Sequence, residues 1–409
     1  MLIYRWHPRF AQRPAAPGQA PRCAQPSDGY EAVAGNGHDA QTRTEHGITQ
    51  RCPEKGGNAR SAETPLSGRV AVPVDFRPSD IPVLLVYNMD PAWSAPERSE
   101  VRAASEELGD ALAEAGHPIV PLEIGHGNIA GYLEVYHPLE QIVFNWCEGL
   151  PGLNHSEWMA ARAMEELGFV FTGASAETLA VTQNKYHTKM ILESRGVPTP
   201  GWRISGSPED SKWDRFPAIV KPVNEHCSEG ISREAVVDSP GELAARIDYI
   251  LQAYNQPVMV EDFIDGREFH VSLWGNGRLE MLPPAEMDFS LFTDLHDRLC
   301  TYDAKFSPGS VPYENIRTLL PAPLSPDELC GIEQVCKAAY QALACRDYAR
   351  IDVRSRDGIF YVLDVNPNAD ISSDASMACA AELAGFSYGE MGSRLVRLAA
   401  ARHPVWGRS

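Results

Sequence analysis

The sequence predicts an α/β fold with α+β subdomains, and three observations lead to this prediction. Between residues 80 and 184, short apolar runs alternate with amphipathic helical segments, which is the pattern of a largely parallel sheet. Between residues 257 and 366, alternating apolar and polar residues are interrupted by Asp-Gly and Asn-Gly turns, as in antiparallel strands. Residues 1–79 are rich in Pro, Gly, Ala, Gln and Arg without a sustained period, so we expect a disordered tail there.

Composition limits the classes of function. The chain has 409 residues, 44% of them hydrophobic, and a formal net charge of −19, which argues against nucleic acid as a partner. Nine cysteines include no C-x-x-C pair, which favours free thiols in a reducing compartment. The chain shows neither a signal-peptide pattern nor an apolar run of membrane-spanning length, so we expect a cytoplasmic protein.

The elements follow from periodicity and from end signals. In the parallel layer we expect strands at 81–89, 118–124, 141–146 and 169–173, and helices at 96–115, 155–168 and 175–194. Beyond it we expect strands at 216–222, 234–237 and within 257–283, and helices at 239–254, 325–345 and 374–401. Ser239 and Ser325 are suitable N-cap residues for two of these helices. Residues 286–326 are expected to be irregular.

The segment 350–366 predicts a hairpin that carries polar side chains on its strands. A two-residue Asp-Gly turn would place Asp352 and Asp364 on opposite faces. A three-residue loop over 356–358 instead sets Arg350 opposite Asp364, and Asp352, Asp364 and Asn366 then share one face. We expect the second register, because oxygen ligands on one face suit Mg²⁺. An ordinary hairpin with a solvated polar face is the alternative.

Taken in order, two lysines, a small-residue loop, an acidic strand segment and this hairpin resemble the ATP-grasp superfamily. Within it, the chain is most similar to the D-alanine–D-alanine ligases, over roughly residues 80–402. The resemblance implies an ATP-grasp fold with an N-terminal Rossmann-like parallel-sheet domain at 80–184. It also implies a subdomain at 185–258 with the phosphate lysines, and a C-terminal subdomain at 259–402 with the adenine hinge, the metal site and the substrate pocket.

For the nucleotide phosphates, the resemblance implies Lys185 and Lys221 as ligands. Lys221 ends a predicted strand, where its ammonium group could meet phosphate oxygens as a point charge. The loop 224–232 contains Ser228 and Gly230, and backbone N–H groups in such a loop can cover a triphosphate. The alternative is that both lysines are ordinary surface residues and that the loop is an ordinary turn.

For the nucleoside, the resemblance implies that backbone groups from Glu261 to Ile264 bind the purine edge. Phe263 and Ile264 would line an apolar slot for the base. Glu268 matches the acid that binds the ribose hydroxyls. Its alternative is a strand-edge glutamate beside Arg267.

For catalysis, the resemblance implies that Asp352, Asp364 and Asn366 bind magnesium. Two ions are expected, Mn²⁺ is expected to substitute, and Asp364 stands where a glutamate is common. Arg350 matches the arginine that stabilises the acyl-phosphate and the tetrahedral intermediate. Guanidinium charge aimed at a developing oxyanion changes the rate by on the order of 10² to 10³. No nucleophilic side chain is needed for this chemistry.

The chain departs from the family pattern at the substrate end. Ala375 stands where the D-alanine ligases carry a serine that holds the second substrate's carboxylate, whereas Lys305 keeps the other half of that contact. Glu97 matches the acid that holds the first substrate's amino group. The hydroxyl companions of this acid are replaced by Cys227 and Phe306. Losing hydroxyl partners costs about 1–3 kcal/mol for each polar atom left unpaired.

We therefore expect an ATP-dependent ligase that joins two amino acids other than D-alanine in a specialised pathway, with a glutamyl or other L-amino-acid donor. Glu148 and Asp374 are candidates for binding a substrate amine. ATP and two amino-acid-like substrates are the expected partners, without nucleic acid or membrane, and the resemblance implies a homodimer. The alternatives are a D-alanine–D-alanine ligase, a ligase for a hydroxy acid or a polyamine, and a non-catalytic ATP-binding module.

Overall fold

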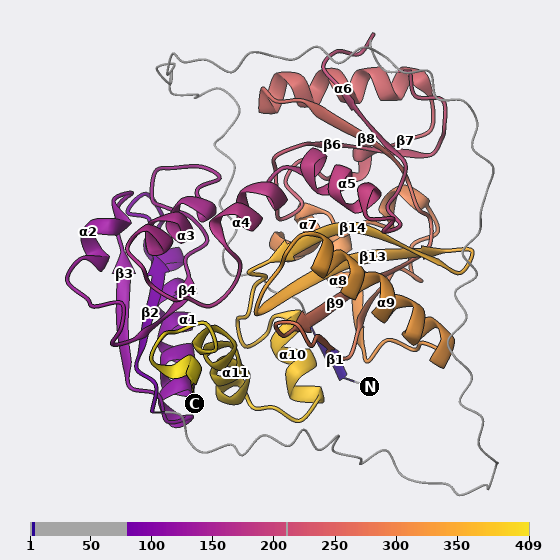
Figure 1. The fold of residues 1–409 in the computed structure, drawn as a ribbon. Helices are drawn as coiled ribbons and strands as arrows, with labels where there is room; N and C mark the ends of the chain where they lie inside the picture. Colours follow the sequence, from indigo (N-terminus) through magenta and orange to yellow (C-terminus); the bar gives the residue numbers. More distant parts are fainter. Residues whose placement is uncertain (1, 5–79, 210–211, 409) are drawn as a thin grey trace, which may run out of the picture. The chain divides into compact units, whose positions relative to one another are not determined.

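The computed structural model describes residues 2–4, 80–209 and 212–408 (Figure 1). The chain divides into one unit made of Met1–Ala11 and Pro65–Ser409 and a second made of Gln12–Thr64, and every residue described here belongs to the first. The predicted tail at 1–79 therefore lies outside the described residues, except for the short strand β1, Leu2–Tyr4, which the sequence did not predict.

The strands form three sheets. The parallel sheet contains β2 (Val83–Asn88), β3 (Ile119–Ile124) and β4 (Ile142–Trp146). The four-stranded sheet contains β5 (Trp202–Ser205), β6 (Ala218–Pro222), β7 (Val236–Val237) and β8 (Val258–Asp262). The seven-stranded sheet contains β1, β9 (Arg267–Trp274), β10 (Glu280–Met281), β11 (Ala285–Asp288), β12 (Arg317–Leu320), β13 (Tyr348–Arg356) and β14 (Ile359–Pro367).

The predicted helices are present with different bounds, the segment expected at 374–401 forms two helices, and the short helix at Ile129–Leu133 was not predicted. They are α1 (Ala95–Glu114), α2 (Ile129–Leu133), α3 (Glu157–Glu166), α4 (Ala176–Thr182), α5 (Lys185–Ser194), α6 (Pro240–Tyr254), α7 (Tyr302–Phe306), α8 (Val311–Asn315), α9 (Pro326–Ala342), α10 (Ser376–Leu383) and α11 (Tyr388–Ala400). Ser239 caps α6 and Ser325 caps α9, as predicted. Residues 286–326 are more regular than expected, because they contain β11, β12, α7 and α8.

The parallel sheet has the order β3-β2-β4, and its central strand is buried on both faces. Leu84 and Val86 belong to one hydrophobic cluster, whereas Val83 and Leu85 belong to another, so successive residues of β2 serve opposite faces. The strand predicted at 169–173 is reduced to a single parallel bridge between Val143 and Phe171.

The single helix predicted at 175–194 is in fact two helices. Asn184 adopts an extended conformation (φ −108°, ψ 109°), and its side chain accepts a hydrogen bond from the His187 amide at 3.2 Å. The extended conformation of Asn184 interrupts the helix after α4, and its side chain caps the N-terminus of α5. This break makes Lys185 the first residue of α5, where its side chain is buried.

The seven-stranded sheet has one apolar and one polar face. Phe269, Val271, Ile351 and Val353 point to the apolar face, where they pack against α9. Their neighbours along β9 and β13 point to the opposite face and are polar, namely Glu268, His270, Ser272, Arg350, Asp352 and Arg354. The apolar face thus fixes the strands, and the polar face carries the candidate site.

The hairpin β13–β14 closes differently from our prediction. Arg356 pairs with Ile359, so the turn has only two residues, Asp357 and Gly358, which both have positive φ. The predicted three-residue loop is therefore wrong. Asp352 nevertheless pairs with Asp364, because Val353 pairs with Val362 and the extra residue Leu363 forms a bulge. Asp352, Asp364 and Asn366 share a face as expected, while Arg350 lies opposite Asn366 rather than Asp364.

Candidate active site

The polar face of the hairpin forms a compact hydrogen-bonded group. Arg350 binds both carboxylate oxygens of Asp352, with Nε donating at 2.7 Å and an Nη donating at 3.0 Å. The Asn366 amide nitrogen donates to the same carboxylate at 3.1 Å. Arg350 is buried and Asp352 is half-buried. The fork geometry therefore fixes the Asp352 carboxylate from two directions.

Neighbouring charges keep the two aspartates of this group ionised. Burial raises the pKa of Asp352, but the Arg350 guanidinium together with His270 and Lys305 outweighs this effect and holds that pKa below its ordinary value. Burial likewise opposes ionisation of Asp364, and its pKa is lowered by Lys185, His226 and Lys221. The structure therefore brings the two predicted phosphate lysines into the electrostatic reach of the predicted metal acids.

A buried chain of charges holds Lys221 in place. Glu261 accepts from Lys221 at 2.5 Å and from Lys189 at 2.8 Å, and its side chain is 1% exposed. Although burial raises the pKa of Glu261, the two ammonium groups hold it below its ordinary value. We predicted that the backbone of Glu261 binds the purine. The structure shows in addition that the Glu261 side chain forms ion pairs with Lys221 and Lys189.

Lys189 is a residue that the sequence analysis missed. Its ammonium group donates to Thr199 Oγ1 at 2.6 Å and to the Val362 carbonyl at 3.1 Å, besides its ion pair with Glu261. Burial lowers its pKa. Its position four residues after Lys185 on one helix face was the available signal, since residues i and i+4 are neighbours on a helix.

Lys185 contacts the loop 224–232, which follows strand β6 of the four-stranded sheet. The Lys185 ammonium donates to the Glu225 carbonyl, and burial lowers the pKa of Lys185. Cys227 and Ser228 both have positive φ, and Ser228 Oγ donates to the Cys300 carbonyl at 2.7 Å. The loop is thereby tied to the segment that precedes α7. Whether its amides cover a triphosphate stays a prediction.

Arg354 organises the segment that we expected to bind the nucleoside. It donates to Glu268 at 2.7 Å and to the Ile264 carbonyl at 3.0 Å, and its guanidinium stacks 4.8 Å from the Phe263 ring centroid. The Phe263 amide donates to the Pro217 carbonyl at 3.1 Å. Arg354 was missed, although it lies two residues after Asp352 and so on the same face of β13.

The predicted substrate residues come from three separate elements. Glu97 accepts from the Ser94 amide at 2.7 Å in the capping box that begins α1. Lys305 is buried in α7, where its charge contributes to lowering the pKa of Asp352. Ala375 is the buried N-cap residue of α10 and offers no side-chain hydrogen bond there. Of these three, Lys305 is the one that the electrostatics connect to the hairpin group.

Several acids gather near the same end of the site. Burial and the neighbouring Asp370 raise the pKa of Glu148, and burial raises the pKa of Glu157 to about 8. Burial also raises the pKa of Asp370, whose carboxylate accepts from the Ser372 hydroxyl at 2.6 Å. Asp370 was missed in the sequence, although it follows the hairpin in Asn368-Ala369-Asp370. Asp374 lies four residues further on.

The hairpin group fits a hard divalent cation. Asp352, Asp364 and Asn366 are half-buried on one face, offer oxygen atoms, and include two carboxylates with lowered pKa. Mg²⁺ prefers oxygen ligands and is usually bound by one or two carboxylates together with substrate phosphates. These three residues would hold the ion, and Arg350 would then have to share Asp352 with it.

Comparison with known proteins gives a consistent result. The family described as D-ala D-ala ligase C-terminus matches residues 206–397. The chain is 32% identical over 301 residues to the uncharacterized protein y4sG of Sinorhizobium fredii, covering 72% of this chain and 86% of that protein. It is 27% identical to a D-alanine–D-alanine ligase of Pseudothermotoga lettingae, covering 74% of this chain and 95% of the relative.

A solved structure shares the fold. The D-alanine–D-alanine ligase of Bacillus anthracis, determined in complex with ATP, superposes with a TM-score of 0.60 at 19% identity, covering 78% of this chain and 97% of that one. No helix among the described residues is long and apolar enough to cross a bilayer. From these matches, the chain belongs to the D-alanine–D-alanine ligase family of ATP-grasp enzymes, which are ligases that form carbon–nitrogen bonds.

Proposed function

We propose that this protein is a cytoplasmic ATP-dependent ligase that forms a dipeptide-type amide bond between two amino acids other than a pair of D-alanines. The observation that carries the proposal is the convergence of Arg350, Lys185 and Lys221 on the ionised aspartates of the hairpin. A donor such as a glutamyl or other L-amino acid, a specialised pathway and a homodimeric assembly are parts of the same proposal.

The reaction proceeds in two displacements. A substrate carboxylate oxygen attacks the γ-phosphorus of ATP, ADP leaves, and an acyl-phosphate remains. The amine of the second substrate then attacks the acyl carbon, phosphate leaves, and the nitrogen loses a proton. Bound magnesium would neutralise charge on the transferring phosphoryl group.

In this mechanism the side chains act by position and by charge. Lys185 and Lys221 hold phosphate oxygens, and the Glu261–Lys189 pair keeps Lys221 extended toward them. Arg350 is held beside the hairpin acids, where its guanidinium stabilises negative charge that develops on the acyl-phosphate and on the tetrahedral intermediate. Glu268 binds the ribose, and Glu261 to Ile264 line the base.

Two features of the substrate end favour a pair other than two D-alanines. Ala375 lacks the hydroxyl with which a carboxylate could hydrogen-bond at the start of α10. Glu148 and Asp370 add acid groups, and each has a pKa raised by burial. A substrate ammonium group would relieve the mutual repulsion of these acids, so we expect an additional amine on one substrate.

Release of ADP in the presence of Mg²⁺ and pairs of amino acids tests the proposal. We expect turnover with a pair that contains a second amino group, and little turnover with D-alanine alone. Rapid formation of D-alanyl-D-alanine would contradict the substrate assignment. An absence of ADP release with all pairs of proteinogenic and D-amino acids would favour the non-catalytic alternative.

The role of Arg350 is tested separately with the best pair. Arg350→Ala should lower kcat by on the order of 10² to 10³. Arg203→Ala, which removes an exposed arginine of β5, is the matched control and should leave kcat unchanged. If Arg350→Ala turns over as fast as this control, the proposed mechanism is wrong.

A further inference from the structure

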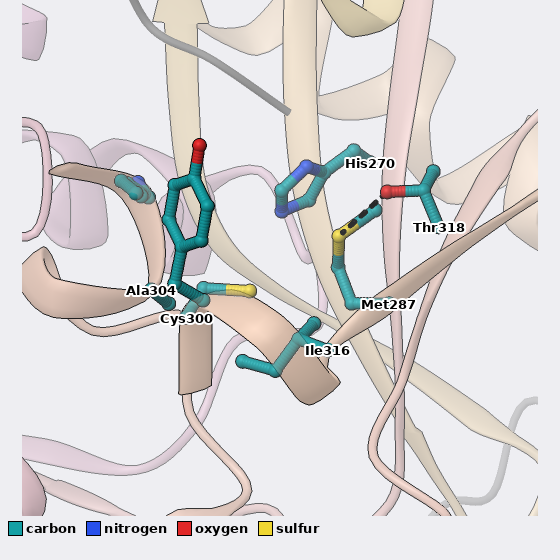
Figure 2. Close-up of a pocket in the computed structure, with 8 residues that line it drawn as sticks. His270, Met287, Cys300, Ala304, Ile316 and Thr318 are labelled. Atoms are coloured by element: carbon teal, nitrogen blue, oxygen red, sulfur yellow. Dashed lines mark hydrogen bonds between the residues drawn. The ribbon is translucent and has the colours of Figure 1, made fainter. Parts of the chain in front are cut away.

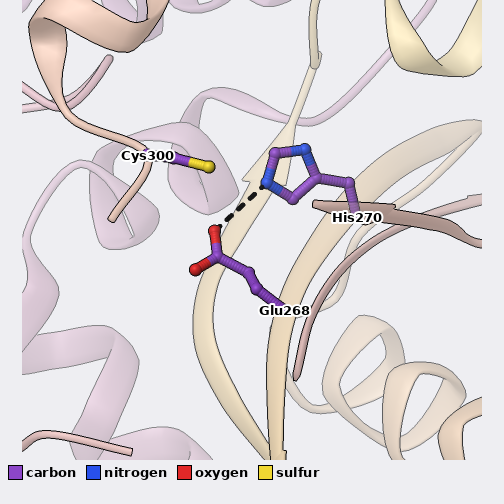
Figure 3. A group of neighbouring side chains, drawn as sticks. All are labelled: Glu268, His270 and Cys300. Atoms are coloured by element: carbon purple, nitrogen blue, oxygen red, sulfur yellow. Dashed lines mark ion pairs between the residues drawn. The ribbon is translucent and has the colours of Figure 1, made fainter. Parts of the chain in front are cut away.

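Beside the nucleotide residues lies a cluster of a different chemical type. Glu268, His270 and Cys300 each offer one potential ligand atom, and these three atoms lie within 4.8 Å of one another. Figure 3 shows the Cys300 sulfur pointing toward the imidazole and the carboxylate. Glu268 and His270 come from the polar face of β9, and Cys300 comes from the segment before α7.

The Glu268 carboxylate contacts Arg354 through one oxygen and His270, within the cluster, through the other. Oε2 accepts from Arg354 Nε at 2.7 Å. Oε1 forms an ion pair with His270 Nε2 at 3.5 Å. Two ligands about 2.0–2.1 Å from a tetrahedral zinc ion are separated by about 3.3–3.4 Å. The observed separation of the two atoms is therefore close to that required for shared coordination.

A cavity of about 40 Å³ adjoins the cluster, and His270 and Cys300 line it together with Met287, Lys305, Tyr313 and Thr318 (Figure 2). A water molecule needs about 10–15 Å³ of such space. The cavity can therefore supply the fourth, non-protein ligand of a tetrahedral ion.

We propose that Glu268, His270 and Cys300 form a binding site for a divalent cation of the zinc type, distinct from the magnesium residues of the hairpin. A thiolate, an imidazole and a carboxylate are each known zinc ligands, whereas the hairpin offers only oxygen donors and suits Mg²⁺. Binding replaces the thiol proton of Cys300, so the thiolate and the carboxylate together balance the charge of the ion.

The site has a consequence that rests on the proposed function. Glu268 is also the residue proposed to bind the ribose of the nucleotide, so the cation and the nucleoside compete for one carboxylate. Zinc would then inhibit the ligase by excluding the nucleotide. The binding of the cation itself does not depend on the ligase assignment.

The direct test adds Co²⁺ to the full chain without nucleotide and records the absorption spectrum. Cobalt bound to a thiolate gives a sulfur-to-metal charge-transfer band, which cobalt bound to Asp352 and Asp364 does not. We expect this band to saturate near one equivalent, and Zn²⁺ to abolish it by displacement. A spectrum without the band, at a Co²⁺ excess, overturns the proposal.

Two cysteine variants locate the site. Cys300→Ser should lose the band and bind Zn²⁺ more than about tenfold more weakly, and Cys345→Ser, which changes another free thiol, should retain both. An equal band in Cys300→Ser and in the unmodified chain overturns the proposal. Their far-ultraviolet circular dichroism shows whether both variants are folded.

Adenosine tests whether Glu268 binds both the cation and the ribose. It carries a ribose but no phosphates that could chelate the ion. We expect adenosine to raise the Co²⁺ concentration needed for half-saturation. If adenosine binds without this effect while the band persists, the ribose role of Glu268 fails and the metal site stands.

Discussion

At the scale of single residues, the site is an alternation of buried charges. Lys221, Glu261 and Lys189 form one series, and Lys189 also reaches the Val362 carbonyl next to the bulge of β14. The Lys189 ammonium group thus connects Lys221, which we propose to bind phosphate, with the strand that carries Asp364. A buried charge that loses its partner destabilises a protein far more than an exposed one does.

Replacing Lys189 by methionine tests this connection. Lys189→Met leaves Glu261 with one cation and should lower the free energy of unfolding by on the order of 3 kcal/mol, measured by urea denaturation. Lys337→Met is the matched control, because Lys337 pairs with Glu333 at 2.6 Å in a half-exposed pair on α9. It should cost about 0.5 kcal/mol or less. Similar losses in the two variants would show that burial of the pair is unimportant.

Glu157 predicts a pH dependence of stability. Burial raises its pKa to about 8, and Asn368 Nδ2 donates to its carboxyl group at 3.1 Å. The folded state therefore keeps a proton that the unfolded chain releases near pH 4.3. Because the folded state binds more protons, the wild-type protein loses stability as pH rises through this interval, and the loss ends above about pH 8.

The contribution of Glu157 to the pH dependence of stability is measured by comparing the wild type with a variant that cannot ionise at this position. Glu157→Gln should lack this loss, so the stability of the wild type relative to the variant should fall between about pH 5 and 8. Glu166→Gln changes an exposed glutamate on the same helix and should follow the wild type. Urea denaturation at several pH values measures all three proteins. Parallel curves for wild type and Glu157→Gln would refute the assignment.

At the scale of elements, the hairpin shows what the sequence could and could not predict. Alternation located both strands and the polar side chains, because period 2 is a local property. The bulge at Leu363 was not predictable, because no local signal distinguishes a paired leucine from an extra one. The shared face of Asp352 and Asp364 was correct, although the loop from which it was derived was wrong.

The same limit applies to the other elements. Caps at Ser239 and Ser325 were predictable because a cap is made by residues close in sequence. Spacing could place Lys189 and Arg354 on the faces of the site, but it could not identify their partners Glu261 and Glu268, which lie far from them in sequence. Of the seven cysteines among the described residues, six are free thiols as expected, whereas Cys330 is disulfide-bonded, which contradicts the expectation for that residue.

The turn of the hairpin gives a test at this scale. Gly358 has φ 75° with open space around it, so Gly358→Ala should cost about 1 kcal/mol through left-handed strain alone. Gly241, in the first turn of α6, is equally open but lacks a positive φ. Gly241→Ala should therefore stabilise by about 0.5–1 kcal/mol. Thermal denaturation compares them, and a shift of the same sign in both would contradict the argument.

At the scale of the whole molecule, Asp347 joins distant parts of the chain. It is fully buried and accepts from the Gly173 amide at 2.9 Å, from Asn276 at 2.8 Å, and from Arg402 at 2.5 and 2.8 Å. These partners belong to the end of the parallel layer, to the loop after β9 and to the segment after α11. The start of β13, and with it the position of Arg350, is fixed by this carboxylate.

Asp347→Asn tests that role while keeping the backbone conformation, since asparagine tolerates the positive φ of 63°. Arg402 would lose its anionic partner, and we expect a loss of about 3–5 kcal/mol in urea denaturation. Asp357→Asn is the matched control, because Asp357 has φ 53° in the exposed turn of the hairpin. It should change stability by less than about 0.5 kcal/mol. Equal losses of stability in the two variants would show that the Asp347 carboxylate does not hold these parts of the chain together.

The bulge at Leu363 also affects how this chain should be aligned with its relatives. A relative whose hairpin lacks the extra residue needs a one-residue gap at Leu363, although its turn and its strands look the same length by eye. Without that gap, Asp364 is matched to a position that faces α9, and the proposed metal ligand is scored as a hydrophobic substitution. Alignments of this region should therefore be anchored on the pair Asp352–Asp364 rather than on the Asp-Gly turn.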